Sequence, residues 1–153
     1  MKEKAAVLRL QRLREQMQRY GIDAYLIVSD DFHASEYVGD HFKCREYVSG
    51  FNGSAGTLVV TMQEAGLWTD GRYFIQAKKQ LEGTGIDLQR MGEKGVPTIG
   101  DYLQMKLRKG QCLGYDGRTV RAGYMRALKE KLRRLELKYE ESIDLVELIW
   151  EDR

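Results

Sequence analysis

The sequence contains little cysteine and proline and no long apolar run. Its 153 residues include two cysteines and one proline. Because Cys44 and Cys112 lie in separate segments and are too few for a disulfide framework, we expect free thiols in a reducing compartment. The N-terminal segment is charged throughout and lacks the apolar core of a signal peptide, and no run of about 18 apolar residues predicts a membrane span. We therefore expect a cytoplasmic protein with no membrane partner.

A strong charge of either sign is also lacking. The chain has 25 basic and 23 acidic residues, which gives a net charge of +2. Nucleic-acid-binding domains usually carry a clear excess of basic residues, so we expect no nucleic-acid partner. The hydrophobic fraction of 42% and the charged fraction of 31% are typical of globular proteins. At this length the chain can form one domain with its own core.

The apolar pattern predicts strands that alternate with helices. A short run rich in strand-forming residues, such as Ala24 to Val28, predicts a buried strand. Apolar residues at three- and four-residue steps predict amphipathic helices. In the first helix these residues are Ala6, Leu10, Leu13, Met17 and Tyr20. The predicted helices cover residues 4–20, 73–81, 99–108, 121–134 and 145–150, and the predicted strands cover residues 24–28, 57–61, 66–69, 86–91, 112–115 and 135–139.

This order indicates an α/β fold, a single domain whose mixed sheet of about six strands is flanked by helices. We expect the sheet to be mostly parallel, with one hairpin formed by residues 57–61 and 66–69. A turn or two of helix is also expected in the connector that precedes Gly50. Gly21 is predicted to end the first helix, and Thr98 and Asp144 are predicted to cap two later helices.

Three glycines at three-residue spacing, Gly50, Gly53 and Gly56, precede the second strand. Glycine adopts positive φ without steric penalty, so these residues predict a sharp turn. The spacing also suggests a phosphate-binding loop, but such loops lead into a helix, and the Walker type carries a lysine. Because this loop leads into a strand and has no lysine, we favour a structural turn or bulge.

The connector after the first strand concentrates residues that could bind a metal. His33 and His41 lie near Asp30, Asp31 and Asp40. A catalytic metal needs three or four converging ligands, and no helical register aligns these side chains. No serine or cysteine sits on the strand-to-helix elbow of a hydrolase nucleophile. We therefore favour a solvated loop and predict neither a metal site nor a catalytic residue in this chain.

The tripeptide Asp70-Gly71-Arg72 follows the third strand and allows two interpretations. Asp70 is placed to cap the next helix, and Arg72 could simply pair with it. Alternatively, the planar guanidinium of Arg72 offers several donors to a carboxylate or peptide carbonyl, which makes it a candidate substrate-binding group.

Two motifs, SGFNGSAGTLVVT and LWTDGRYFIQA, resemble the N-terminal domain of the aminopeptidase P group in the creatinase/prolidase superfamily. The resemblance extends to His33 with residues 35–37, to Arg45, and to the pattern that begins at Asp144. It therefore covers essentially all of residues 1–153. The fold that it implies is the creatinase/prolidase N-terminal fold with a ribonuclease H-like motif.

The resemblance implies that this chain is the N-terminal part of a larger Xaa-Pro aminopeptidase, which removes the N-terminal residue from peptides with proline second. The enzymes it resembles use two divalent metal ions, expected to be manganese, held by two Asp, one His and two Glu of a C-terminal pita-bread domain. That domain is absent from this chain, so we expect no catalysis and no catalytic metal here. The implied partners are the chain's own C-terminal catalytic domain, a second copy in a homodimer, and the peptide substrate.

Residue by residue, the resemblance implies that Arg72 faces the substrate groove and that His33 and Tyr37 line the same rim. Asp70 and Gly71 are expected to fix the turn that aims Arg72. The glycines at positions 50, 53 and 56 are expected to support the motif. The chain departs from the family pattern at Asn52, Gly117 and Cys44. The alternatives are an Xaa-Pro dipeptidase, a creatinase-like amidinohydrolase, or a stand-alone ligand-binding module with the same fold.

Overall fold

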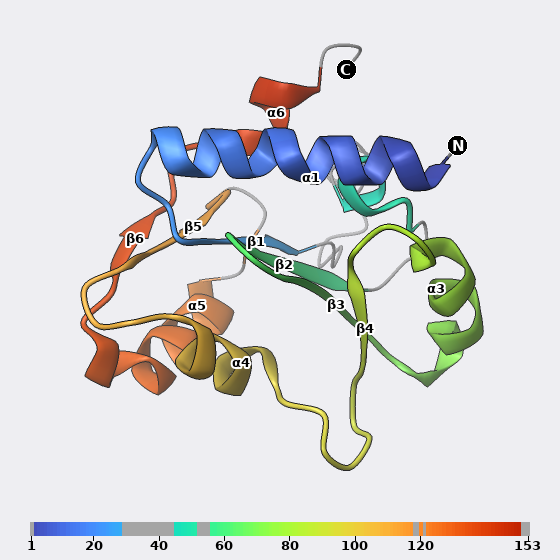
Figure 1. Ribbon diagram of the computed structural model, residues 1–153. Helices are drawn as coiled ribbons and strands as arrows, with labels where there is room; N and C mark the ends of the chain where they lie inside the picture. The colour runs from blue at the N-terminus through green and yellow to red at the C-terminus, as the bar shows by residue number, and fades with distance from the viewer. Residues whose placement is uncertain (1, 29–44, 52–55, 118–119, 121, 151–153) are drawn as a thin grey trace.

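A six-stranded mixed sheet forms the centre of the protein (Figure 1). The computed structural model describes residues 2–28, 45–51, 56–117, 120 and 122–150. The strands lie in the order β4-β3-β2-β1-β5-β6. Strand β2 is antiparallel to both of its neighbours, and the other three pairings are parallel. The predicted mixed sheet with one hairpin is therefore confirmed. The strands are β1 (Ala24–Val28), β2 (Thr57–Thr61), β3 (Ala65–Thr69), β4 (Asp87–Arg90), β5 (Cys112–Tyr115) and β6 (Lys138–Glu140).

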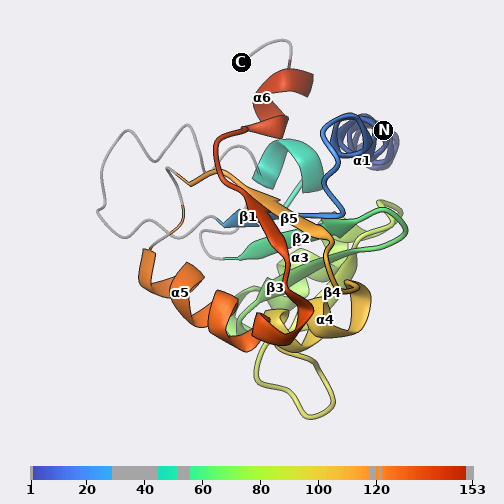
Figure 2. The same ribbon diagram turned by 90° about the vertical axis from the view of Figure 1, so that its left-hand side faces the viewer.

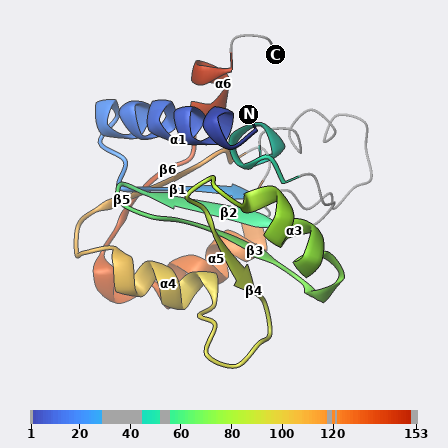
Figure 3. The ribbon, with the colours of Figure 1, turned by 45° about the vertical axis from the view of Figure 1, so that its right-hand side comes forward.

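Helices cover both faces of this sheet (Figures 1 and 2). One face is covered by α1 and α6, and the other by α4 and α5. Helix α3 lies beside β4 at the edge of the sheet (Figure 3). Residues 45–49 form a further short helix on the side of α1. The helices are α1 (Lys2–Arg19), α3 (Phe74–Leu81), α4 (Ile99–Lys106), α5 (Ala122–Lys131) and α6 (Leu145–Ile149), with 3-10 turns η1 (Gly71–Tyr73) and η2 (Arg133–Leu135).

Strand β1 shows why the sequence forms this layered core. All five of its residues are buried. Because successive side chains of a strand point to opposite faces, Tyr25 and Ile27 pack in the cluster under α1 and α6. Ala24, Leu26 and Val28 pack in the cluster under α4 and α5. A continuous apolar run is therefore required here, as predicted for a strand buried on both faces.

Hydrogen bonds and one aromatic contact attach the α6 segment to the rest of the domain. The hydroxyl of Tyr25 donates to the carbonyl of Ile143 at 2.9 Å and accepts from the backbone N–H of Leu145 at 3.2 Å. The ring of Trp150 stacks on Tyr47 with centroids 4.5 Å apart. These contacts join the end of the chain to the first strand and to the 45–49 helix.

The predicted caps are confirmed, but Tyr20 is placed wrongly and the helices predicted at 99–108 and 121–134 are too long, since α4 ends at Lys106 and α5 at Lys131. Gly21 has φ +70°, Thr98 Oγ1 accepts from the N–H of Asp101, and Asp144 Oδ1 accepts from the N–H of Glu147. Tyr20 does not join the buried face of the first helix; it is 43% exposed because α1 ends at Arg19.

The predicted strand at 135–139 starts too early. Leu135 closes η2, and Glu136 adopts a left-handed conformation with φ +47°, so the chain is still turning there and β6 begins at Lys138.

The parallel strands β1, β3, β4, β5 and β6 all end at the same edge of the sheet, where β2 begins. Val28 pairs with Thr57, and Thr57 pairs with Trp68. This register brings the end of the glycine-rich loop beside the turn that follows β3. Functional groups of α/β proteins commonly lie at such carboxyl ends.

No helix in the described part of the chain has the length and apolarity needed to cross a membrane.

Candidate functional site

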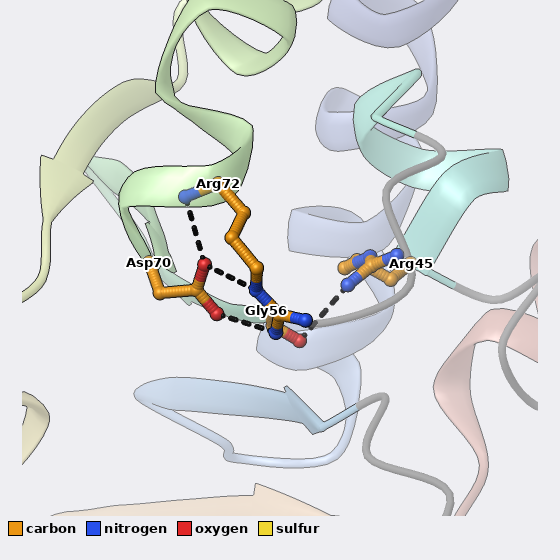
Figure 4. A network of polar contacts seen from close by, with 4 residues as sticks. All are labelled: Arg45, Gly56, Asp70 and Arg72. Atoms are coloured by element: carbon orange, nitrogen blue, oxygen red, sulfur yellow. Dashed lines mark hydrogen bonds and ion pairs between the residues drawn. The ribbon is translucent and has the colours of Figure 1, made fainter.

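In the turn after β3, the Arg72 side chain is hydrogen-bonded to the Asp70 carboxylate, two residues earlier. The Asp70 carboxylate accepts from the backbone N–H of Arg72 at 3.0 Å and so caps η1. The Arg72 side chain donates from Nε to Oδ1 at 3.0 Å and from Nη2 to Oδ2 at 2.9 Å (Figure 4). Asp70 is thus both the predicted helix cap and the partner of the guanidinium.

Both members of this pair are charged at neutral pH. The hydrogen bond from the Arg72 side chain is the main cause that lowers the pKa of Asp70 below its ordinary value. The same hydrogen bond, followed by the carboxylate's charge, raises the pKa of Arg72. Hydrogen bonding to the charged form of a group favours that form, so both shifts favour the ion pair.

Arg72 remains open to a ligand although it is paired. Its side chain is 70% exposed, while that of Asp70 is 39% exposed. None of the described residues accepts a hydrogen bond from its Nη1. The guanidinium carbon lies 5.1 Å from the centroid of the Tyr73 ring. A peptide carbonyl or carboxylate can therefore reach the guanidinium from solvent.

Gly71 sits within η1 and is not among the residues with positive φ. A Cβ placed on it would meet only Phe74 Cε2, at 4.0 Å. The turn therefore forms through the Asp70 cap and does not require a glycine at position 71.

The glycine-rich loop owes its composition to two different causes. Gly50 has φ +79°, as predicted for a sharp turn. Gly56 is not among the residues with positive φ, so its glycine has a different cause. A Cβ on Gly56 would lie 2.8 Å from Arg45 Nη1 and 3.3 Å from the carbonyl oxygen of Trp68. Close packing, not backbone conformation, therefore requires glycine at position 56.

Arg45 is the main site residue whose role the sequence did not reveal. It is only 2% exposed. Its Nη1 donates to the Gly56 carbonyl at 3.1 Å, and its guanidinium lies 4.8 Å from the Phe51 ring centroid (Figure 4). The one available signal was a glycine directly before a strand, which often marks a close approach of another group. Arg45 therefore fixes the backbone at the start of β2, which pairs with β3, the strand that leads to Asp70 and Arg72.

Several predicted site residues lie outside the described residues. They include both predicted rim residues and the histidine and aspartate cluster of the first connector: Asp30, Asp31, His33, Tyr37, Asp40, His41, Cys44, Asn52 and Gly53. Among the described residues, no group of three His, Cys, Asp or Glu side chains could hold a metal ion. Cys112 is a free cysteine, and burial raises the pKa of its thiol, so it is a poor nucleophile at neutral pH.

A second concave surface lies away from this turn. It is a groove of about 430 Å³ between the 91–98 loop and helices α4 and α5, with Trp68, Pro97, Tyr124 and Leu128 among its lining. Lys131, at the same groove, is ion-paired with Asp101 at 2.8 Å. The groove is largely apolar and offers no cluster of reactive groups.

Comparison with known proteins matches almost all of the chain to one family. The family described as the creatinase/prolidase N-terminal domain matches residues 9–153. Aminopeptidase P2 of Arabidopsis thaliana is 46% identical over 134 residues, which cover 86% of this chain and 19% of that protein. The chain thus spans about a fifth of the length of the curated relatives it matches.

Solved structures agree with the sequence match. X-prolyl aminopeptidase from Caenorhabditis elegans, described as a cytosolic enzyme with a di-nuclear active site, superposes with a TM-score of 0.85 at 34% identity. The match covers 97% of this chain and 26% of that one. The N-terminal domain of the cytoplasmic peptidase PepQ from Mycobacterium tuberculosis superposes with a TM-score of 0.66 at 27% identity, over 94% of this chain and 98% of that domain.

Proposed function

The chain belongs to the creatinase/prolidase N-terminal domain family, and we propose that it is the non-catalytic N-terminal domain of a longer Xaa-Pro aminopeptidase. Two observations support this: the matched relatives named aminopeptidase P are more than four times as long as the chain, and the PepQ structure corresponds to one N-terminal domain over almost its full length. On this proposal residues 1–153 form one domain, and catalysis belongs to a C-terminal pita-bread domain.

The proposed reaction removes the N-terminal residue from peptides whose second residue is proline. The two divalent ions, which we propose to be manganese, are assigned in this proposal to the catalytic domain. There they supply an activated water as the nucleophile. The di-nuclear active site of the nematode relative supports this assignment.

In this proposal the catalytic domain carries the metals, and Arg72 of the N-terminal domain contributes to the rim of the substrate groove. The single observation that carries the proposal is the geometry of its side chain, which is 70% exposed and anchored through Nε and Nη2, while no described residue accepts a hydrogen bond from Nη1. An anchored guanidinium orients a peptide at little entropic cost, since its own position is already fixed. His33 and Tyr37 are proposed to line the same rim. We further propose a cytoplasmic homodimer in which this domain forms part of the contact surface.

The test uses the polypeptide encoded by the complete reading frame, supplied with manganese and assayed with Ala-Pro-Ala. We expect release of alanine, and a loss of about tenfold or more in kcat/KM for Arg72→Ala, because an oriented charge-assisted contact is removed. Arg126→Ala, which removes an exposed arginine of α5, is the matched control and should retain activity.

Three outcomes would contradict the proposal. A reading frame that ends at Arg153 would favour the stand-alone module. Cleavage restricted to Xaa-Pro dipeptides would favour the dipeptidase. Unchanged kinetics for Arg72→Ala would leave the arginine a purely structural group.

A further inference from the structure

We infer that Asp70 is a specificity-determining residue, which makes Arg72 bind a neutral peptide carbonyl in preference to a free carboxylate. The inference rests on the proposed function and deepens it, because it names the part of the peptide that meets this turn. It starts from the donors that Asp70 occupies. A guanidinium has five N–H donors. Asp70 takes Nε–H and one donor of Nη2, at 3.0 and 2.9 Å.

The remaining donors, on Nη1 and Nη2, form the outer edge of the guanidinium. A ligand bound to that edge shares Nη2 with Asp70 Oδ2. If the ligand is a carboxylate, two anionic groups then lie against one nitrogen, and like charges at this separation repel. A peptide carbonyl carries only a partial charge and avoids most of this penalty.

The local charge leads to the same result. Arg72 and Asp70 together have no net charge, and their shared hydrogen bonds favour the ionised form of both groups. The described residues provide no other ion-pair partner for either group. The pair is therefore a dipolar donor and not a cationic site. An arginine without this partner would attract carboxylates more strongly.

This preference bears on substrate length. In an Xaa-Pro dipeptide the group that follows the proline ring is the terminal carboxylate, whereas in a longer peptide it is a backbone carbonyl. Where that group meets Arg72, a turn that favours the carbonyl disfavours the dipeptide.

The experiment compares two ligands that differ only in this group, Ala-Pro with a free carboxylate and Ala-Pro amide. The polypeptide encoded by the complete reading frame, 15N-labelled and stripped of metal so that no cleavage occurs, is titrated with each at low ionic strength, and the Arg72 Nε–Hε NMR signal reports binding. The wild-type chain should bind the amide at least as tightly as the acid. In Asp70→Asn the acid-to-amide affinity ratio should rise about three- to fivefold, the effect expected for one exposed charge.

Asp70→Asn keeps an oxygen that accepts from the Arg72 backbone N–H, so the cap and the fold should persist, which circular dichroism verifies. Asp101→Asn is the matched control: it removes one exposed, ion-paired carboxylate from α4 and should leave the ratio at the wild-type value. A wild-type preference for the acid, or an unchanged acid-to-amide affinity ratio in Asp70→Asn, overturns the inference. Either result leaves the proposed binding of peptide by Arg72 unaffected. A signal that responds to neither ligand in either protein overturns both.

Discussion

Arg45 and Arg72 are two arginines with opposite environments, one buried and one exposed. They lie at one end of the sheet, one beneath the start of β2 and the other after the end of β3 (Figure 4). Arg45 is 2% exposed, packs on Phe51 and donates to the Gly56 carbonyl. The Arg72 side chain is 70% exposed and pairs with Asp70. The same residue type thus fixes buried backbone at one position and is exposed to solvent at the other.

The difference shows that burial, more than residue type, decides what an arginine does. A buried guanidinium must have its donors satisfied within the protein, so it orders the backbone around it. An exposed one contributes little to stability and retains donors for a ligand. Arg45 therefore belongs to the scaffold, and Arg72 to the surface that the scaffold positions.

The largest expected effect tests this division directly. Arg45→Ala should lower the free energy of unfolding by about 3 kcal/mol, because it leaves a cavity beside Phe51 and removes the buried hydrogen bond to the Gly56 carbonyl. Arg72→Ala should leave the midpoint of urea unfolding unchanged. Urea denaturation of both variants checks the prediction. Equal loss of stability in the two variants would refute the comparison.

A smaller effect is expected from the two glycines beside these arginines. Gly56→Ala should destabilise the protein by about 2 kcal/mol, since its Cβ would overlap Arg45 Nη1 and press on the Trp68 carbonyl. Gly71→Ala should change stability by less than about 0.5 kcal/mol, because its Cβ has room and its φ is not positive. Thermal unfolding measured by circular dichroism separates the two. A tolerated alanine at position 56 would show that Arg45 is free to move.

The smallest expected effect concerns pH. The folded-state pKa of Asp70 lies below its ordinary value, so the pair's stabilisation is present above the unfolded-state pKa of about 4 and is lost as the pH falls through the lower folded-state value. Because both groups are exposed, the change in stability should be small.

The measurement for this prediction is an NMR titration of the Asp70 carboxyl carbon, compared in the wild-type chain and in Arg72→Ala. Removing the arginine should move the titration midpoint upward, toward the ordinary value for aspartate. An identical midpoint in the two proteins would show that Arg72 does not hold the carboxylate.

Much of the fold follows from local sequence. The runs at Ala24–Val28 and Cys112–Tyr115 predict their strands with the observed bounds, and Thr98 and Asp144 cap helices as their positions indicate. These features depend on neighbours within a few residues, so pattern and capping chemistry are sufficient. The start of β6 is harder to predict from sequence, because η2 and the left-handed Glu136 interrupt a segment whose composition suits a strand.

The sequence by itself determined the alternation of strands and helices, the cap that Asp70 provides, and the motifs that identify the family. Only the tertiary structure decided that Gly56 is required by Arg45, eleven residues earlier, and that Asp70 occupies one edge of the Arg72 guanidinium. The physical reason is the sequence distance over which the interactions act. Capping and periodicity are local properties of the backbone, whereas burial and the sharing of donors depend on which segments the sheet brings together.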